Sequence, residues 1–182
     1  VAAPVTGTIQ HFALRGKDYI VLPLQNGKVK IVQRSGEDRL TLEQQLPGSK
    51  YPYVLKVGSD LSKSFLIQID TLGTMSQLSL NSDKKEIAFD EFNDAQGYLF
   101  MDANGDNAND IVFAKGNKVV ALNMDKEYLF QFETVGQITS APQRFSMSSS
   151  NMTGVSTAGE IYLIKRDGTA YEGFPLLGST PF

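Results

Sequence analysis

The sequence contains no cysteine, no tryptophan and a single histidine, His11. Without cysteine the chain can form neither a disulfide nor a Cys-based zinc site, and it has no thiol nucleophile. One histidine leaves little scope for acid–base catalysis near neutral pH, because histidine is the side chain that ordinarily titrates there. These absences remove the commonest catalytic and zinc-binding arrangements from consideration.

The chain also lacks an excess of charge of either sign and any long apolar run. It carries 17 Lys and Arg against 20 Asp and Glu, a net charge of −3, and neither sign forms a long block. Nucleic acid is therefore not an expected partner, because phosphate binding needs clustered basic charge. The apolar runs are only a handful of residues long, so we expect no membrane-spanning segment.

What the sequence does contain is a repeat. Pairs of runs rich in branched and aromatic residues, such as "DIVFAK" (110–115) and "NKVVAL" (117–122), are joined by a glycine. Glycine accepts the positive φ of tight turns, so each pair predicts a β-hairpin. The joining glycines follow one another at spacings of 46, 43 and 43 residues: Gly27, Gly73, Gly116 and Gly159.

A second turn follows each pair and predicts a third and a fourth strand in every unit. These turns lie at nearly constant distance from the glycine, at 34–38, 81–85, 123–127 and 165–169. Apolar residues never recur at helical spacing over a dozen positions. Four short strands in a repeat of about 40 to 45 residues are typical of a β-propeller blade.

We therefore predict an all-β chain, a β-propeller of about four blades with four antiparallel strands each, in a single domain spanning 1–182. A meandering β-sandwich is the alternative, but a sandwich has no reason to keep a glycine register through four units. The predicted units cover approximately 7–46, 51–92, 95–136 and 137–177.

Residues 178–182 resemble the start of a further unit, because "GSTPF" repeats the small, polar and proline pattern that precedes Phe145. Propellers close with about 4 to 8 blades, and an unclosed stack leaves strand edges exposed. Two arrangements follow: four blades closed with the help of "TGTIQHF" (6–12), or a segment of a larger propeller that buries its open ends by self-association. We favour the segment.

The stretch "DANGDNAND" (102–110) lies between a predicted first strand, "GYLFM" (97–101), and the second strand of the third unit. This loop resembles the repeats of FG-GAP and VCBS propellers, which have the form Asp-x-Asn-Gly-Asp-x-x-x-Asp. The matching residues are Asp102, Asn104, Gly105, Asp106 and Asp110. The rest of the chain, particularly "GEIYLIKRDGTAYEGFPLLGSTPF" (159–182), resembles the quinoprotein-like propeller repeats of bacterial surface and periplasmic proteins. The resemblance implies an extracytoplasmic location.

The chemistry of the loop allows a structural calcium site. Ca²⁺ takes about 6 to 8 oxygen ligands from carboxylates, amides and carbonyls. The candidate ligands are Asp102, Asn104, Asp106, the carbonyl of Ala108, and Asp110. A plain turn is the alternative, because Asn, Asp and Gly cluster in turns without any metal. The equivalent loops of the other units, at 15–18, 58–63 and 146–151, lack the ligand pattern, so one site at most is expected.

Other candidate residues point more weakly to function. His11 has no recognisable partner motif, and a lone histidine in a β-rich stretch is more often a surface or core residue than a base. Several aromatic residues are available for a ligand groove, but most are expected to pack between blades. These are 51–53 ("YPY"), Tyr98, Tyr128, Tyr162, Tyr171 and Phe174.

The sequence is compatible with two functions. The first is a non-enzymatic binding or scaffolding module that engages a protein or a glycan. The alternative is an enzyme, a hydrolase or a quinone-dependent oxidoreductase, with its site on the axial face of the propeller. The scarcity of convergent catalytic residues favours the binding module, and the absence of tryptophan, which often docks between quinoprotein blades, weakens the redox alternative.

Overall fold

The computed structural model describes residues 3–5, 8–26, 28–46, 49, 51–147 and 150–178. Several sequence predictions fall outside these ranges. They concern Gly27, residues 6 and 7 of the predicted closing strand, residues 148 and 149 of the loop 146–151, and 179–182 of the predicted further unit.

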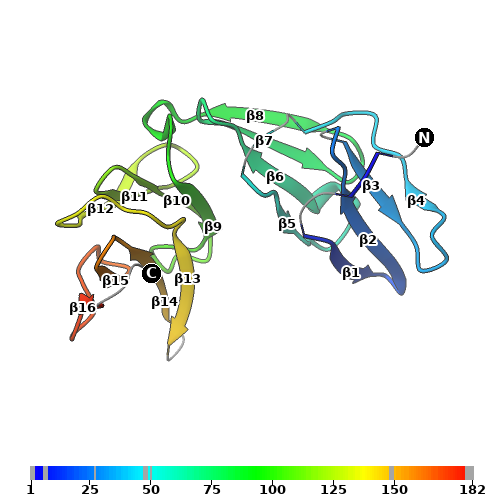
Figure 1. Ribbon diagram of the computed structural model, residues 1–182. Helices are drawn as coiled ribbons and strands as arrows, with labels where there is room; N and C mark the ends of the chain where they lie inside the picture. Colours follow the sequence, from blue (N-terminus) through cyan, green and yellow to red (C-terminus); the bar gives the residue numbers. More distant parts are fainter. Residues whose placement is uncertain are drawn as a thin grey trace. The chain divides into compact units, whose positions relative to one another are not determined.

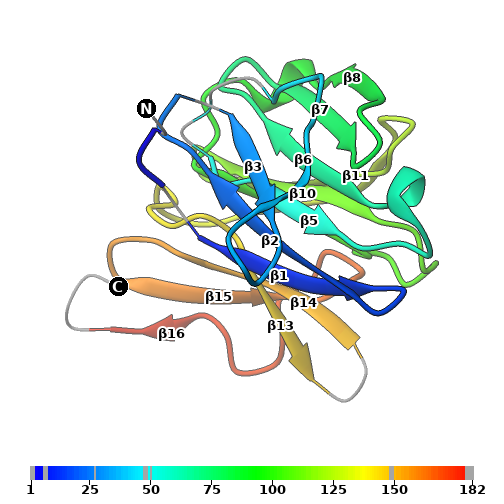
Figure 2. The same ribbon diagram turned by 90° about the vertical axis from the view of Figure 1, so that its right-hand side faces the viewer.

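The described residues form four antiparallel sheets of four strands each (Figure 1). The first sheet contains β1 (Gln10–Leu14), β2 (Lys17–Pro23), β3 (Val29–Val32) and β4 (Asp38–Leu40). The second contains β5 (Val54–Lys56), β6 (Phe65–Ile69), β7 (Thr74–Ser79) and β8 (Lys84–Ala88). The third contains β9 (Gly97–Met101), β10 (Asp110–Lys115), β11 (Lys118–Leu122) and β12 (Tyr128–Glu133). The fourth, orange and red in Figure 2, contains β13 (Gln143–Met147), β14 (Ser150–Ser156), β15 (Glu160–Ile164) and β16 (Leu176–Leu177).

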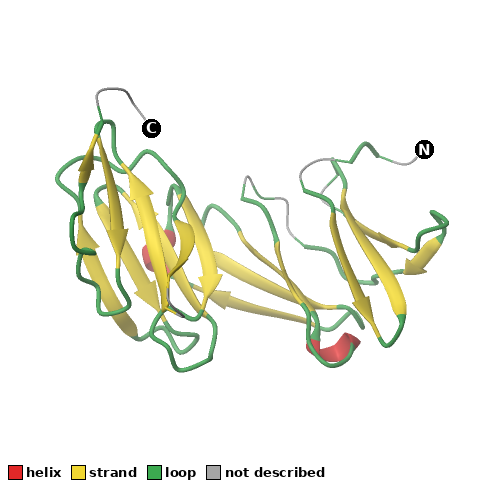
Figure 3. Cartoon of the chain, turned by 90° about the horizontal axis from the view of Figure 1, so that it is seen from below, coloured by secondary structure: helices red, strands yellow, loops and turns green. Residues whose placement is uncertain are grey.

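Strands that are consecutive in the sequence are neighbours in every sheet. The only helical elements among the described residues are two short 3₁₀ helices, η1 (Leu61–Lys63) and η2 (Asp90–Phe92), drawn red in Figure 3. None of the described helices is long and apolar enough to cross a membrane. The prediction of an all-β chain built from four-stranded antiparallel units is confirmed.

The chain divides into two compact units, Val1–Glu91 and Phe92–Phe182, each of which holds two of the four sheets. The four sheets lie within the residue ranges predicted for the four repeats. The prediction that all four belong to one domain stays a prediction.

The turn between the third and fourth strands has the same geometry in all four sheets. An amide N–H donates to the carbonyl three residues earlier in each: Gly36 to Gln33, Ser82 to Ser79, Lys126 to Asn123 and Gly168 to Lys165. The donor residue has a positive φ of 87°, 78°, 69° and 76°, respectively. A three-residue hairpin loop that ends in a left-handed residue has this form, and it adds a local twist to the strands it joins. The repeat predicted from the sequence is therefore present in the backbone.

The predicted glycine register is less uniform. Gly73 and Gly116 have a φ of 89° and 60° and occupy the tight turns expected of them. For Gly159 the expectation of a positive φ is wrong, because its turn is closed by Thr157, whose N–H donates to the carbonyl of Glu160 at 2.9 Å. Gly159 is the second residue of this two-residue turn, whereas Gly116, which has a positive φ, is the first residue of the turn between Lys115 and Lys118.

In the unit 1–91, the two sheets share one core. Val21 and Ile31 of the first sheet are fully buried with Leu66 and Leu78 of the second. A hydrogen bond at 3.0 Å from the N–H of Glu43 to the hydroxyl of Ser82 also joins the segment after β4 to the turn between β7 and β8. Branched side chains from facing strands thus bury apolar surface that neither sheet could cover alone.

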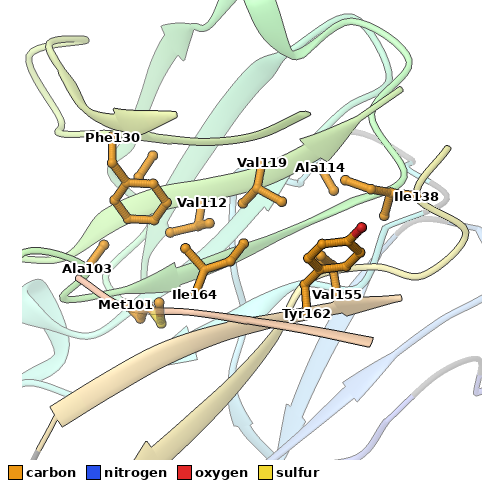
Figure 4. Packing of buried hydrophobic residues seen from close by; sticks show 11 residues of the cluster. Met101, Ala103, Val112, Ala114, Val119, Phe130, Ile138, Val155, Tyr162 and Ile164 are labelled. Atoms are coloured by element: carbon orange, nitrogen blue, oxygen red, sulfur yellow. The ribbon is translucent and has the colours of Figure 1, made fainter. Parts of the chain in front are cut away.

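The unit 92–182 is built in the same way. Val112, Val119 and Phe130 of the third sheet face Val155 and Ile164 of the fourth across an apolar interface (Figure 4). Tyr162 lies at one side of this cluster, where its hydroxyl donates to the carboxylate of Glu160 and accepts the N–H of Val135 at 3.2 Å. Its polar tip therefore has partners while its ring packs edge-on against Phe132, with centroids 5.7 Å apart.

We expect the substitution Ile164→Ala to lower the free energy of unfolding by about 2–5 kcal/mol, because it leaves a cavity in this interface. Val135→Ala is the matched control: that side chain is 90% exposed, so its loss should change stability by no more than about 0.5 kcal/mol. Urea denaturation of both variants measures the difference. Equal effects would show that the interface does not stabilise the unit.

Candidate functional site

The acidic loop, residues 102–110, connects β9 to β10, as the sequence predicted. Its turn is tight because Gly105 and Asn107 both have positive φ, 95° and 67°. Gly and Asn are the residues that adopt this region most readily, which explains the composition of the loop.

Three of the five predicted ligands come together. Asp102, Asp106 and Asp110 each offer a carboxylate oxygen, and these oxygens all lie within 4.8 Å of one another. Asp110 is buried with only 1% of its surface exposed, Asp102 is partly buried and Asp106 is exposed. The cluster is thus open on one side and anchored in the sheet on the other.

The other two predicted ligands are differently placed. The Asn104 side chain is held in the turn, where its amide donates to Asp106 at 3.0 Å and its oxygen accepts the N–H of Asp106 at 2.9 Å. Ala108 contributes its own N–H, which donates to Asp106 at 2.7 Å. Both residues thus help to hold the turn, and their assignment as calcium ligands stays a prediction.

Backbone N–H groups donate hydrogen bonds to the carboxylates of the loop and so stabilise their negative charge. Asp102 accepts the N–H groups of Gly105 and Asn107, and Asp110 accepts the N–H of Ala103 at 2.9 Å. Bonds of this kind favour an ionised carboxylate.

The environments of two carboxylates differ in a way that separates their pKa values. Hydrogen bonds from Asn104 and from the N–H of Ala108 lower the pKa of Asp106. Burial raises the pKa of Asp110, and the charges of Asp106 and Asp102 add to that rise. Asp110 is therefore the carboxyl of this pair that takes up a proton first as the pH falls.

Two side chains from the fourth sheet complete the site, and the sequence analysis missed both. The guanidinium of Arg166 lies 3.9 Å from the carboxylate of Asp102, and the amide of Asn151 donates to the Asp102 carbonyl at 3.1 Å. Arg166 also lies over Gly105, where a β-carbon would be 2.6 Å from Nη1. The acidic loop thus has a cationic counter-group supplied by the turn that follows β15.

His11 lies outside this cluster, on β1 of the other unit. Its Nε2 is 2.8 Å from the carboxylate of Asp18, which also pairs with Arg34 at 2.9 Å. The hydrogen bond to His11 is the main cause of a lowered pKa at Asp18. The His11 side chain is 52% exposed, as expected for a surface residue in an ion-pair network.

Most of the candidate aromatic residues are structural, as predicted. Tyr51, Tyr53, Tyr98 and Tyr162 are buried. Burial raises the pKa of Tyr53 to about 12. Tyr128 is exposed, and Tyr171 lines a pocket at the end of the fourth sheet.

No protein-family model and no curated protein sequence matches the chain. Solved structures do resemble it. The crystal structure of BBS1N in complex with ARL6DN, soaked with mercury, matches with a TM-score of 0.68 at 10% identity, over 97% of this chain and 55% of that chain. The same complex soaked with lead matches with a TM-score of 0.62 at 9% identity, over 95% and 51%. A streptogramin B lyase structure matches with a TM-score of 0.57 at 16% identity, over 94% and 55%.

These neighbours are β-propellers, so the likeness confirms the predicted fold: the chain has a β-propeller fold in which each four-stranded sheet is one blade. At this level of identity the likeness concerns the fold alone. The chain spans about half the length of the structures that it matches.

We expect Gly105→Ala to destabilise the chain by about 1–3 kcal/mol, because an alanine is strained at this positive φ. The new methyl group also pushes the Arg166 guanidinium away from Asp102. Gly173→Ala is the matched control, because Gly173 has a φ of 86° and open space around the added methyl. Thermal or urea denaturation gives both values, and a smaller loss at Gly105 than at Gly173 would contradict the geometry of the loop.

Proposed function

We propose that this chain is a non-enzymatic binding module that engages a protein partner through the fourth blade. The observation that carries the proposal is the exposure of β13: all five of its residues are exposed, including Phe145 and Met147 at 46% and 44%. β13 pairs with β14 on one side only and is therefore an edge strand of its sheet. Exposed edges with large apolar side chains are typical of surfaces that bind another protein.

The fold supports the same proposal. BBS1N, which shares it, has been solved in complex with ARL6DN. A propeller thus provides a rigid scaffold for protein recognition, while the partner itself is set by the surface residues of each chain. The sequence analysis also predicted a glycan as an alternative ligand, and that stays a prediction.

A photo-crosslinking amino acid at position 147 tests the binding surface in cells that express the chain. We expect one discrete adduct from position 147 and none from the matched position 72, because Leu72 is a comparably large side chain, 72% exposed, in a turn of the other unit. The adduct should disappear when Phe145 is replaced by Gln in the same chain. Adducts of equal yield at both positions would contradict the proposal.

The enzyme alternative is kept because of two observations. One structural neighbour is named as a lyase, and three carboxylates with a guanidinium converge at the acidic loop. The three carboxylates belong to the acidic loop, where Asp102 and Asp106 already accept N–H groups of the loop itself. Their hydrogen bonds favour a structural role for the loop over a catalytic one.

We further propose that the acidic loop binds calcium as a structural ion. Asp102, Asp106 and Asp110 would supply carboxylate oxygens, and Asn104 and the Ala108 carbonyl would join them after the turn rearranges. A cation would offset the mutual repulsion of carboxylates whose oxygens lie within 4.8 Å of one another, which Arg166 balances only in part. The extracytoplasmic location, the FG-GAP-like assignment and self-association remain predictions.

Calcium titration of the metal-free chain tests this site. We expect saturable binding at millimolar or lower concentration and a higher melting temperature, since a ligand at about ten times its Kd stabilises the folded state by roughly 1.4 kcal/mol. Asp106→Asn should weaken binding at least tenfold, whereas Asp60→Asn, in the equivalent loop of the second blade, should not. Acidification should also weaken binding, because the raised pKa of Asp110 makes a proton compete with the ion. Unchanged melting at millimolar calcium would leave the loop as a plain turn.

A further inference from the structure

A pocket lies at the end of the fourth blade, beside the acidic loop. Its walls come from the end of β13, the start of β14 and the segment that follows β15. The residues that matter here are Met147, Asn151, Met152, Lys165, Arg166 and Tyr171. All of them belong to the unit 92–182, and among them only Tyr171 was a candidate ligand contact in the sequence analysis.

Two cations of the pocket retain unused donors. The Nε of Arg166 is buried and has no hydrogen-bond partner among the described residues, and its ion pair with Asp102 is long at 3.9 Å. The ammonium of Lys165 lies 3.7 Å from Asp167, whose other carboxylate oxygen already accepts two hydrogen bonds from Thr169. A buried donor without a partner costs free energy, so an acceptor that reaches Arg166 from the pocket would be stabilised.

The rest of the lining is apolar and adaptable. Met147 and Met152 are flexible side chains that fit varied ligand shapes. The ring of Tyr171 is held in place by its backbone, since its N–H donates to the Leu163 carbonyl at 2.7 Å, and by edge-on packing against Phe174 with centroids 6.3 Å apart. A ligand for this pocket therefore needs an apolar body next to its anionic group.

The neighbouring acids limit the charge of that group. Asp102 and Asp167 lie beside Arg166 and Lys165, respectively, so the two cations are not free to balance two negative charges. A monoanion meets less repulsion here than a dianion such as phosphate. A carboxylate also matches the fork of a guanidinium.

We propose that this pocket binds an apolar monocarboxylate, with Arg166 and Lys165 on the carboxylate and the two methionines and Tyr171 around the apolar body. This chemistry has two sources: the C-terminal residue of a partner protein and a small free organic acid. The inference rests on the proposed binding function and names the chemistry that the fourth blade recognises.

Titration of the ¹⁵N-labelled chain, followed by NMR, tests the inference. The probe is N-acetyl-leucine, and its control is N-acetyl-leucinamide, which keeps the apolar body and lacks the carboxylate. We expect N-acetyl-leucine to shift the amide signals of 150–152 and 165–171 in a saturable manner, and the amide to bind at least tenfold more weakly. Equal binding of both compounds, no binding of either, or tighter binding of inorganic phosphate would overturn the proposal.

Substitutions test whether Arg166 and Lys165 bind the carboxylate of the ligand. Arg166→Gln and Lys165→Gln should each weaken N-acetyl-leucine at least fivefold, while Lys118→Gln, which removes a lysine paired with Glu133 elsewhere in the same unit, should leave its affinity unchanged. Arg166→Gln removes the ion pair with Asp102 and can therefore disturb the acidic loop. Lys165 pairs with Asp167, outside the acidic loop, so Lys165→Gln tests the pocket without that complication. Binding that is indifferent to both substitutions would contradict the assignment.

A longer peptide separates the two sources. A hexapeptide ending in leucine with a free carboxylate should bind at least tenfold more tightly than N-acetyl-leucine if the natural ligand is a chain terminus, and no more tightly if it is a small acid. The crosslinking at position 147 is read independently. An adduct without any binding of N-acetyl-leucine would leave the binding function standing and refute the carboxylate pocket, whereas saturable binding of N-acetyl-leucine without any adduct would refute the protein-binding function and leave the pocket as a site for a small acid.

Discussion

A sheet that is apolar on both faces has to be covered on both faces, and the rest of this structure depends on that constraint. Successive residues of a strand point to opposite sides, yet five consecutive residues of β10, 110–114, are buried. One four-stranded sheet in water could not tolerate this pattern. The fourth sheet covers Val112 and Ala114 on one face of β10, and on the other face Phe113 packs against Phe92 with ring centroids 4.8 Å apart.

The same packing decides which loops become neighbours. With the third and fourth blades face to face, the β9–β10 loop lies beside the turn after β15, and Arg166 reaches Asp102. The amide of Asn151 joins the same loop from β14. The charge of the acidic loop is therefore balanced by a residue from the neighbouring blade. Arg166 also lines the pocket at the end of the fourth blade.

Much of the fold could be predicted from the sequence, because strand and turn signals are local. The runs 97–101 and 110–115 coincide with β9 and β10, and the acidic loop lies where it was placed. Its contact with Arg166 could not be predicted, because 64 residues separate Arg166 from Asp102 and no local pattern pairs them. The exception among local signals is Gly159, which is the second residue of its two-residue turn and has no positive φ, whereas Gly116 is the first residue of such a turn and has one.

The turn between the third and fourth strands depends little on the identity of its side chains. Its hydrogen bonds join backbone groups, and its left-handed position holds a glycine twice, a serine once and a lysine once. Mutation can therefore replace nearly every side chain of such a hairpin while the hairpin persists. An architecture held by backbone hydrogen bonds places few demands on side-chain identity, so very different amino-acid sequences can form the same blade.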